Sequence, residues 1–334
     1  MQSSFVMSLA PVVVFAYNRP DLLDKTLGWL GENEHAEQSV LFIYCDGAKP
    51  DANQDQLNKI AAVRRIAVEW ARKGLFKDVR IIEREHNLGL GTSIITGVSD
   101  VVKEYGKCIV LEDDLQTSPL FLDYMNQCLD HYEKRKSVFS VSGLSRPHPE
   151  RFYPKDYPYD VYVSLTHHPT GWATWSDRWE QVDWSAKHFS TLLEDKYIQR
   201  AFKRAGNEMW DQMLLCKQTG RNIWSVLFYL AHFENHAISI CPIVSYIEHI
   251  GWGADSTNCP GDGAAWKHER LADKKEIRFL DILYEDSRII NSWYSFRFIK
   301  RRSLLGRVIN MYGRRFKNKD EYYLKGRVYA DQKD

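Results

Sequence analysis

The first 145 residues alternate between short apolar runs and longer stretches in which apolar and polar positions recur with helical spacing. The apolar runs predict buried strands at Val12–Phe15, Leu41–Tyr44, Val79–Glu83, Cys108–Leu111 and Val138–Val141. The amphipathic stretches between them predict helices at 21–30, 54–73, 92–105 and 119–133. Short strands that alternate with helices pair in parallel through right-handed crossovers. We therefore predict an α/β fold built on a mostly parallel, doubly wound sheet.

Polar residues or glycines follow each of the first four predicted strands. In chain order they are Asn18 and Arg19, then Asp46 and Gly47, then His86, Asn87, Gly89 and Gly91, then Asp113 and Asp114. Ligands of open parallel sheets bind outside the carboxyl ends of the strands, so these residues predict one shared crevice. The alternative is that each polar residue only marks the start of a loop. That alternative explains each position singly, but it does not explain all four together.

The fourth predicted strand ends in three consecutive carboxylates, Glu112, Asp113 and Asp114, within the segment CIVLEDDLQTS. No lysine or arginine flanks them in the sequence, and burying an unpaired carboxylate costs several kcal/mol or forces it to take up a proton. One interpretation is a solvated turn. The other is a site that binds a cation, for which carboxylate oxygens favour Mg²⁺ or Mn²⁺ bridging to a diphosphate. An empty site, or an arginine of the same chain in it, in crystals soaked with nucleotide and manganese would contradict the second interpretation.

Other motifs and the composition narrow the function further. The segment AYNRPD after the first strand is not the G-x-G-x-x-G of dinucleotide-binding proteins, no Walker motif is present, and Gly89-Leu90-Gly91 is weak evidence for phosphate binding. A formal net charge of +1 argues against nucleic-acid binding. The 11 Trp and 18 Tyr fit either an aromatic core or a sugar-binding surface. Six cysteines without a CxxC pair indicate a reducing, cytoplasmic setting.

The segments VVVFAYNRPDLLDKTL, CDG, NLGLG and LEDDL resemble the GT-A nucleotide-sugar glycosyltransferases, near family 2. VLEDDLQTSPLFLDYM is similar to the metal-binding segment of N-acetylglucosaminyltransferase I. The resemblance spans about residues 10 to 260. It implies a GT-A fold and a metal-dependent hexosyl- or N-acetylhexosaminyltransferase. Such an enzyme moves a sugar, from a UDP-linked donor, to a hydroxyl of a glycan or lipid-linked acceptor, with inversion.

The resemblance also implies roles for individual residues of the donor site. Asp114 ligates Mn²⁺ or Mg²⁺, Asp113 meets the ribose or the donor sugar, and Glu112 supports the sugar end. Asp46 holds the uracil ring. The remaining donor-site residues are Asn18 and Arg19 in the base pocket, and Asn87 and Gly89 in the loop after the third strand. His249, in the segment IEHIGWGADSTNCPGDG, adds a metal or diphosphate contact.

Residues 146–265 lose the regular alternation of strands and helices and are rich in aromatic residues. Trp172, Trp175 and Trp179 have i, i+3, i+7 spacing and predict one face of a helix, which either packs in the core or contacts an acceptor. By the resemblance, Trp172 lines the acceptor site and Asp211 is the general base of an inverting transfer. Asp177 and Asp183 are rivals for the second role.

We expect three segments: a nucleotide-sugar-binding half at 1–145, an acceptor half at 146–270 of the same domain, and a basic helical extension at 271–334. Ser287–Lys319 carries ten Lys or Arg and no Asp or Glu, with an apolar stripe at helical spacing. This pattern favours peripheral contact with an anionic membrane, although nucleic-acid contact or a solvated face also fits it. Two other functions stay open at this stage: a non-catalytic carbohydrate-binding protein on the same scaffold, and a sugar-phosphate nucleotidyltransferase.

Overall fold

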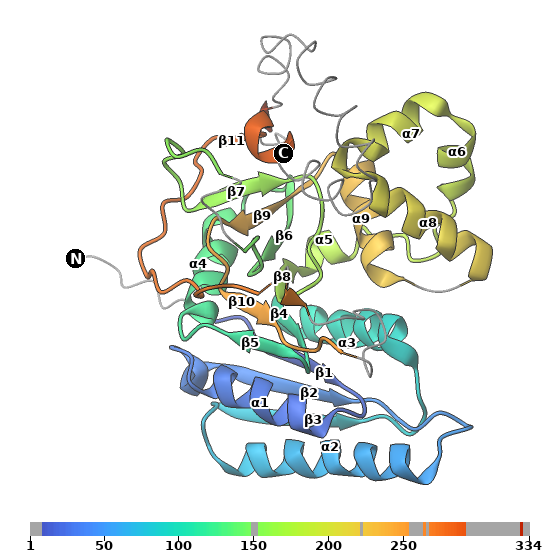
Figure 1. Cartoon of the computed structure of the whole chain (residues 1–334), viewed down its shortest axis with the longest axis vertical. Coiled ribbons are helices and arrows are strands. Elements are labelled where there is room, and N and C mark those ends of the chain that lie inside the picture. Colours follow the sequence, from blue (N-terminus) through green and yellow to red (C-terminus); the bar gives the residue numbers. More distant parts are fainter. Residues whose placement is uncertain are drawn as a thin grey trace.

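An eight-stranded sheet forms the centre of the structure, with the strand order β3-β2-β1-β4-β8-β6-β9-β7 (Figure 1). The computed structural model describes residues 9–147, 153–220, 223–253, 263–264, 267–291 and 328–329. Five of the strands are β1 (Val12–Ala16), β2 (Val40–Cys45), β3 (Asp78–Glu83), β4 (Lys107–Glu112) and β6 (Val138–Ser142). They coincide with the five predicted strands. The pairs β3-β2, β2-β1 and β1-β4 are parallel, so the predicted fold class is confirmed.

The helices between these strands also match the predicted ones. They are α1 (Pro20–Gly31), α2 (Gln54–Arg72), α3 (Gly89–Tyr105) and α4 (Phe121–Tyr132). Residues at the N-termini of α1 and α2 explain where these two helices begin. Pro20 opens α1, where its missing N–H has no helical partner to lose. Asn53 caps α2, accepting a hydrogen bond from the Gln56 amide while the Gln56 side chain bonds back to the Asn53 amide.

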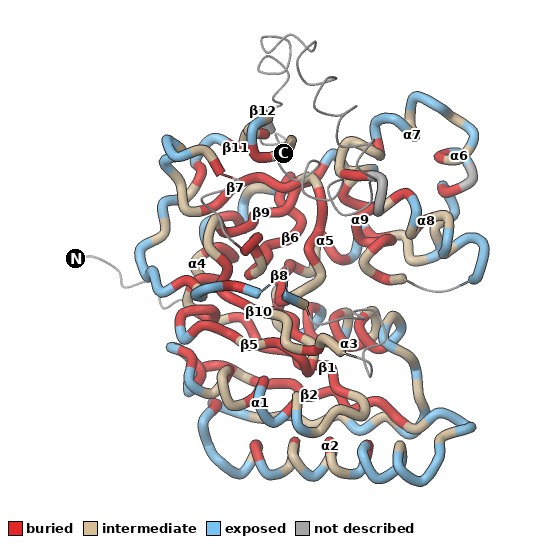
Figure 2. Tube along the Cα trace, in the orientation of Figure 1, coloured by how far each residue is buried: buried red, intermediate tan, exposed pale blue. Residues whose placement is uncertain are grey.

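The helices cover both faces of the sheet and create two separate apolar layers. One layer packs α1, α2 and α4 against the strands through residues such as Leu27, Val63 and Leu129. The other packs α3 against the opposite face through Ile94 and Val98. Figure 2 shows most of the strands as a buried centre under half-exposed helices, whereas the edge strand β3 is partly exposed. Each fully buried Leu or Val contributes about 2 kcal/mol by leaving water.

The sheet continues without interruption past residue 145. β8 (Trp172–Trp175) lies between β4 and β6 and is antiparallel to both. Beyond them, β9 (Ile238–Pro242) pairs parallel with β6 and antiparallel with β7 (Val161–Ser164). The helix predicted for the tryptophans is therefore wrong, because Trp172 and Trp175 lie on a strand. Buried on both faces, this strand has no polar face that would reveal its two-residue period.

A helical module follows β8 and packs around its own small core (Figure 1). After the one-turn helix α5 (Ser176–Trp179), it contains α6 (Phe189–Glu194), α7 (Lys196–Phe202), the 3₁₀ turn η3 (Lys203–Ala205), α8 (Asn207–Thr219) and α9 (Trp224–Glu234). Phe228 of α9 belongs to the same apolar layer as α3. The module is thus attached to the sheet through α9.

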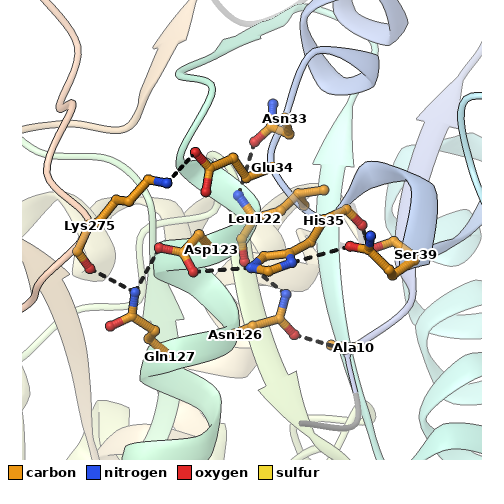
Figure 3. A network of polar contacts seen from close by, with 11 residues as sticks. Ala10, Asn33, Glu34, His35, Ser39, Leu122, Asp123, Asn126, Gln127 and Lys275 are labelled. Atoms are coloured by element: carbon orange, nitrogen blue, oxygen red, sulfur yellow. Dashed lines mark hydrogen bonds and ion pairs between the residues drawn. The ribbon is translucent and has the colours of Figure 1, made fainter. Parts of the chain in front are cut away.

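Residues 267–286 form an extended strap that returns across α4, and polar contacts fasten it (Figure 3). Lys275 Nζ lies 2.6 Å from Glu34, in the connection after α1. The Gln127 side chain of α4 donates to the Lys275 carbonyl at 2.8 Å and to Asp123 at 2.7 Å. Asp123 also pairs with His35 Nε2 at 3.2 Å. The strap, α4 and the α1–β2 connection, which contains η1 (Ala36–Gln38), are thereby tied together.

The described residues contradict the first part of the predicted C-terminal helical extension. Residues 271–286 are not the start of a helix: they belong to the strap and end in β11 (Leu283–Tyr284), which pairs with β12 (Val328–Tyr329). The basic stretch from 292 to 319 lies outside the described residues, and so does the membrane contact predicted for it. Cys45 and Cys108 are buried free thiols on β2 and β4. Within the described ranges, no helix is long and apolar enough to cross a membrane.

Candidate active site

The carboxyl ends of β2, β1 and β4 lie side by side and present the predicted donor-site residues. Parallel register pairs Phe15 with Glu112 and Ala16 with Cys45. The chain therefore leaves these strands at the same level of the sheet. Asp46 follows β2, the segment 17–19 follows β1, and the acidic triplet follows β4. The crossover topology, which brings together residues about 95 positions apart, is what forms this site.

The two aspartates of the triplet are paired with an arginine of the same chain. Arg19 Nη1 lies 2.7 Å from Asp114 Oδ2, and Arg19 Nη2 contacts Asp113 Oδ1. The aspartate side chains are only 3% and 5% exposed, whereas that of Arg19 is 27% exposed. The acidic run, which no basic residue flanks in the sequence, therefore has a basic neighbour in space. This neighbour is distant in the sequence and becomes adjacent only because β1 and β4 are paired. Its guanidinium contacts the two aspartates, and its predicted place in the base pocket stays a prediction.

The three carboxyl groups of the triplet differ in charge. Burial, together with the charges of Asp114 and Asp113, raises the pKa of Glu112 to about 8, so Glu112 is mostly protonated at neutral pH. Burial also raises the pKa of Asp113, to about 6, although Arg19 opposes the rise. Burial acts in the same direction on Asp114, but the hydrogen bond to His249 and the charge of Arg19 outweigh it and lower its pKa. Asp114 is therefore the most firmly ionised of the three.

A short two-stranded sheet brings His249 to Asp114. β5 (Leu115–Thr117) pairs antiparallel with β10 (Ile247–His249), with His249 opposite Leu115. His249 Nε2 lies 3.3 Å from Asp114 Oδ2, and the Ile250 amide donates to the Asp114 carbonyl at 2.9 Å. Figure 1 shows β5 and β10 together near the middle of the molecule, next to β4. The structure thus places the two predicted metal residues next to each other, and their binding of a metal stays a prediction.

Gly251, the second residue after His249, packs directly on the Asp114 carboxylate. A Cβ at this position would lie 2.3 Å from Asp114 Oδ2. Any side chain at 251 therefore has to displace either the β10 segment or Asp114. The sequence around this position contains several glycines and does not indicate which of them the site needs.

Thr26 is a site residue that the sequence analysis missed. Its hydroxyl donates to the Asp113 carbonyl at 3.0 Å and accepts from the Leu115 amide at 3.1 Å, which fixes the turn that carries Asp113 and Asp114. The side chain is fully buried in α1 between Leu23 and Leu27. A threonine on the apolar stripe of a helix was the available signal, since a buried hydroxyl needs a polar partner.

Asp46 organises the loop that leads into α3. Its two carboxylate oxygens accept hydrogen bonds from the amides of Gly47, Leu88 and Gly89 and from the side chain of Asn87, at 2.9 to 3.1 Å. The backbone approaches closely as well, because a Cβ on Gly47 would meet the His86 backbone at 2.4 Å. The structure thus brings Asp46, Asn87 and Gly89 together as predicted neighbours. Their contact with a nucleotide stays a prediction.

A divalent cation fits the donor set only with help from a ligand. In the described part of the chain, no group of three His, Cys, Asp or Glu residues is arranged to hold a metal. Asp114 Oδ2 and His249 Nε2, however, are 3.3 Å apart. Two adjacent ligands of one octahedral ion, each at about 2.1 Å, would be about 3 Å apart. These two atoms fit such an ion if His249 releases the Nε2 proton that it donates to Asp114 and if phosphate oxygens and water supply the other positions.

The residues predicted for the acceptor side lie in different environments. Trp172 is 1% exposed and stacks between Trp179 and Trp224, with ring centroids 5.6 and 5.0 Å away, so its place is that of a core residue. Asp211 lies on α8 and is exposed to solvent. Their roles toward an acceptor stay predictions.

The rivals of Asp211 are poorly placed for the role of base. Asp177 follows the end of β8, where Trp175 pairs with Lys107 at the start of β4, at the opposite edge of the sheet from Asp114. Its carboxylate also pairs with Lys136 at 2.6 Å. Asp183 bonds to Ser185 and Lys187 of its own turn. We therefore retain Asp211 as the candidate.

The fold and the acidic strand end define a class of protein, and the family comparison agrees with it. The model of the family described as glycosyl transferase family 2 matches residues 12–200. The chain belongs to this family, and its fold is of the GT-A type.

Individual relatives are distant. The chain is 24% identical over 192 residues to an alpha-1,3-mannosyl-glycoprotein 2-beta-N-acetylglucosaminyltransferase of Arabidopsis thaliana, a match that covers 53% of this chain and 41% of the relative. The chain thus spans less than half the length of that curated relative. Among solved structures, S. aureus TarS has a TM-score of 0.40 at 13% identity, covering 72% of this chain and 36% of TarS. A UDP-glucose pyrophosphorylase complexed with UDP-glucose has a TM-score of 0.35 at 12% identity, covering 70% and 90%.

Proposed function

We propose that the enzyme transfers a hexosyl or N-acetylhexosaminyl group from a UDP-sugar to a hydroxyl of a glycan or lipid-linked acceptor, with inversion. The observation that supports this most is the turn after β4. There Thr26 fixes Asp113 and Asp114 at the carboxyl edge of the sheet, and β10 brings His249 to within 3.3 Å of Asp114. Ligands of parallel sheets bind at this edge.

Asp114 and His249 are the residues that would hold Mn²⁺ or Mg²⁺ in this site. When bound, the ion supplies positive charge that stabilises the departing diphosphate. The other carboxyl groups have separate tasks. Asp113 accepts hydrogen bonds from the ribose or the donor sugar. Burial raises the pKa of Glu112, which favours its protonated form and lets it donate a hydrogen bond to a sugar oxygen.

Inversion requires a base that removes the proton of the acceptor hydroxyl as its oxygen attacks the anomeric carbon. We assign this role to Asp211. Its helix is one of those in the module between β8 and β9, which borders the second half of the sheet. The donor would lie at the strand ends, so the acceptor would enter between these ends and the module.

A donor screen tests the proposal. Purified protein is incubated with a panel of nucleotide sugars and Mn²⁺, and released nucleoside diphosphate is measured. We expect release from one UDP-sugar, and a loss of at least about a hundredfold in Asp114→Ala. Asp55→Ala is the matched control, because it also removes a carboxylate but from an exposed pair with Lys59 on α2. Wild-type-like turnover in Asp114→Ala would overturn the assignment of the site.

A thermal-shift measurement separates this proposal from its alternatives. UDP together with Mn²⁺ should raise the Tm of a transferase, because both ligands bind the folded state. A carbohydrate-binding protein on this scaffold would respond to sugars only. A nucleotidyltransferase would consume a nucleoside triphosphate and release pyrophosphate.

A further inference from the structure

Arg19 contacts Asp113 and Asp114, here called the acidic pair, through a different guanidinium nitrogen for each aspartate. Nη1 bonds to Asp114 and Nη2 to Asp113, so the planar guanidinium bridges two carboxylates instead of binding one of them at both oxygens. The backbone of Arg19 is fixed as the N-cap residue of α1, and its carbonyl accepts from the Leu23 amide at 3.0 Å. The side chain can therefore swing about a fixed anchor while the strand ends stay in place.

The contact with Asp114 uses the atom that a metal would need. Asp114 Oδ2 is the oxygen bonded to Arg19 Nη1 and also the one nearest His249 Nε2. A divalent ion held by Asp114 and His249 at this oxygen would compete with the guanidinium for the same position. Two positive groups cannot share it without strong repulsion in a buried site.

The aspartates cannot simply be left without a partner either. Their side chains are 3% and 5% exposed, and a buried carboxylate without a counter-charge costs several kcal/mol. An exchange of partners has to be concerted: a new cation arrives as the old one leaves. A guanidinium that leaves carboxylates has a good alternative partner in phosphate oxygens, which it binds with the same two-nitrogen geometry.

We propose that Arg19 is the resident counter-cation of the acidic pair, and that it moves to the diphosphate of the donor when the metal takes Asp114. Metal and nucleotide then bind together, and the metal alone binds weakly because it must displace Arg19 without compensation. This inference rests on the proposed function. It adds that Arg19 is the group that couples binding of the two ligands.

Binding measurements without turnover test the inference. Mn²⁺ is titrated into the protein with and without saturating UDP, and free Mn²⁺ is followed by electron paramagnetic resonance. The variants are Arg19→Gln, Arg19→Lys, and Lys25→Gln as a control that removes an exposed charge from the same helix. The Mn²⁺–UDP complex that forms in solution is common to all of them and cancels from the comparison.

We expect Arg19→Gln to bind Mn²⁺ alone about tenfold or more tightly than the wild type, and to lose about tenfold or more of the gain that UDP gives. Lys25→Gln should behave like the wild type. Arg19→Lys keeps the charge but cannot span both carboxylates, so it should show the same changes to a smaller degree. If Arg19→Gln does not fold, Arg19→Lys takes its place in the measurement.

Two negative results have different meanings. If Arg19→Gln changes Mn²⁺ affinity equally with and without UDP, Arg19 is a permanent structural partner of the aspartates, and the inference is wrong while the metal assignment stands. If neither the wild type nor any variant binds Mn²⁺ even with UDP, the metal dependence in the proposed function fails, and the inference fails with it.

Discussion

Replacing Gly251 with alanine probes the least tolerant contact of the site. The added Cβ would lie 2.3 Å from Asp114 Oδ2 and 2.8 Å from the Asp114 Cβ and Cγ. Ordinary van der Waals contact begins at 3.4 Å. The two groups must therefore separate by about 1 Å. Gly251 does not have a positive φ, so the substitution adds no backbone strain and the steric effect is isolated.

The size of the expected loss in activity depends on which residues the added Cβ displaces. The Ile250 amide holds the Asp114 carbonyl at 2.9 Å and His249 lies one residue further back, so separation at 251 shifts His249 relative to Asp114. A misplacement of about 1 Å in a reacting site costs about a hundredfold in rate. That factor is about 2.7 kcal/mol of transition-state stabilisation. The overpacking itself should lower the free energy of unfolding by about 1–3 kcal/mol.

The assay measures kcat/KM for nucleoside diphosphate release together with the free energy of unfolding in urea. Gly106→Ala is the control: Gly106 ends α3 with a φ of +78°, and a Cβ there meets nothing within 4 Å. It should cost about 1 kcal/mol of stability and leave kcat/KM unchanged. If Gly251→Ala retains kcat/KM within about threefold of the wild type, the contact does not position the site.

Three further predictions concern other parts of the molecule. Asp46→Asn places an amide against N–H donors, so we expect a loss of about 2–3 kcal/mol in the free energy of unfolding; an unchanged urea midpoint would contradict the loop-organising role. Asp211→Asn should lower kcat by at least about a hundredfold with UDP affinity retained, and a wild-type pH–rate profile would exclude Asp211 as the base. Burial lowers the pKa of His232 to about 4, so the unfolded state, where histidine titrates near pH 6.5, takes up the proton first. Stability is therefore full above about pH 6.5 and falls as the pH drops toward 4, by about 2 kcal/mol between pH 7.5 and pH 5. His232→Gln should remove this part of the pH dependence, and an equal slope in both proteins would refute the assignment.

The first half of the fold could be predicted because its signals are local. Short apolar strands such as Val12–Phe15 and clear helix starts such as Pro20 are read directly from neighbouring residues. Parallel pairing through right-handed crossovers then follows, although these rules do not fix the order of the strands. This also places Asp46 and Asp113 at one edge before any coordinates are known.

The second half and the contacts of the site could not be predicted in the same way. β8 is buried on both faces, so its WATW sequence does not distinguish a strand from a helix. The pairing of Arg19 with Asp113 and Asp114 depends on side-chain geometry across two strands, and no local pattern encodes it. Thr26 shows the intermediate case, because its burial could be predicted from helical spacing but its partners could not.

The central claim is that the acidic pair exchanges Arg19 for a divalent ion when the nucleotide binds. A crystal structure with UDP and manganese, with an anomalous map at the manganese edge, tests it most directly. The account predicts a manganese peak about 2.1 Å from Asp114 and His249, with Arg19 bonded to the diphosphate. A structure in which UDP is bound, no manganese is present, and Arg19 still bridges Asp113 and Asp114 would contradict it.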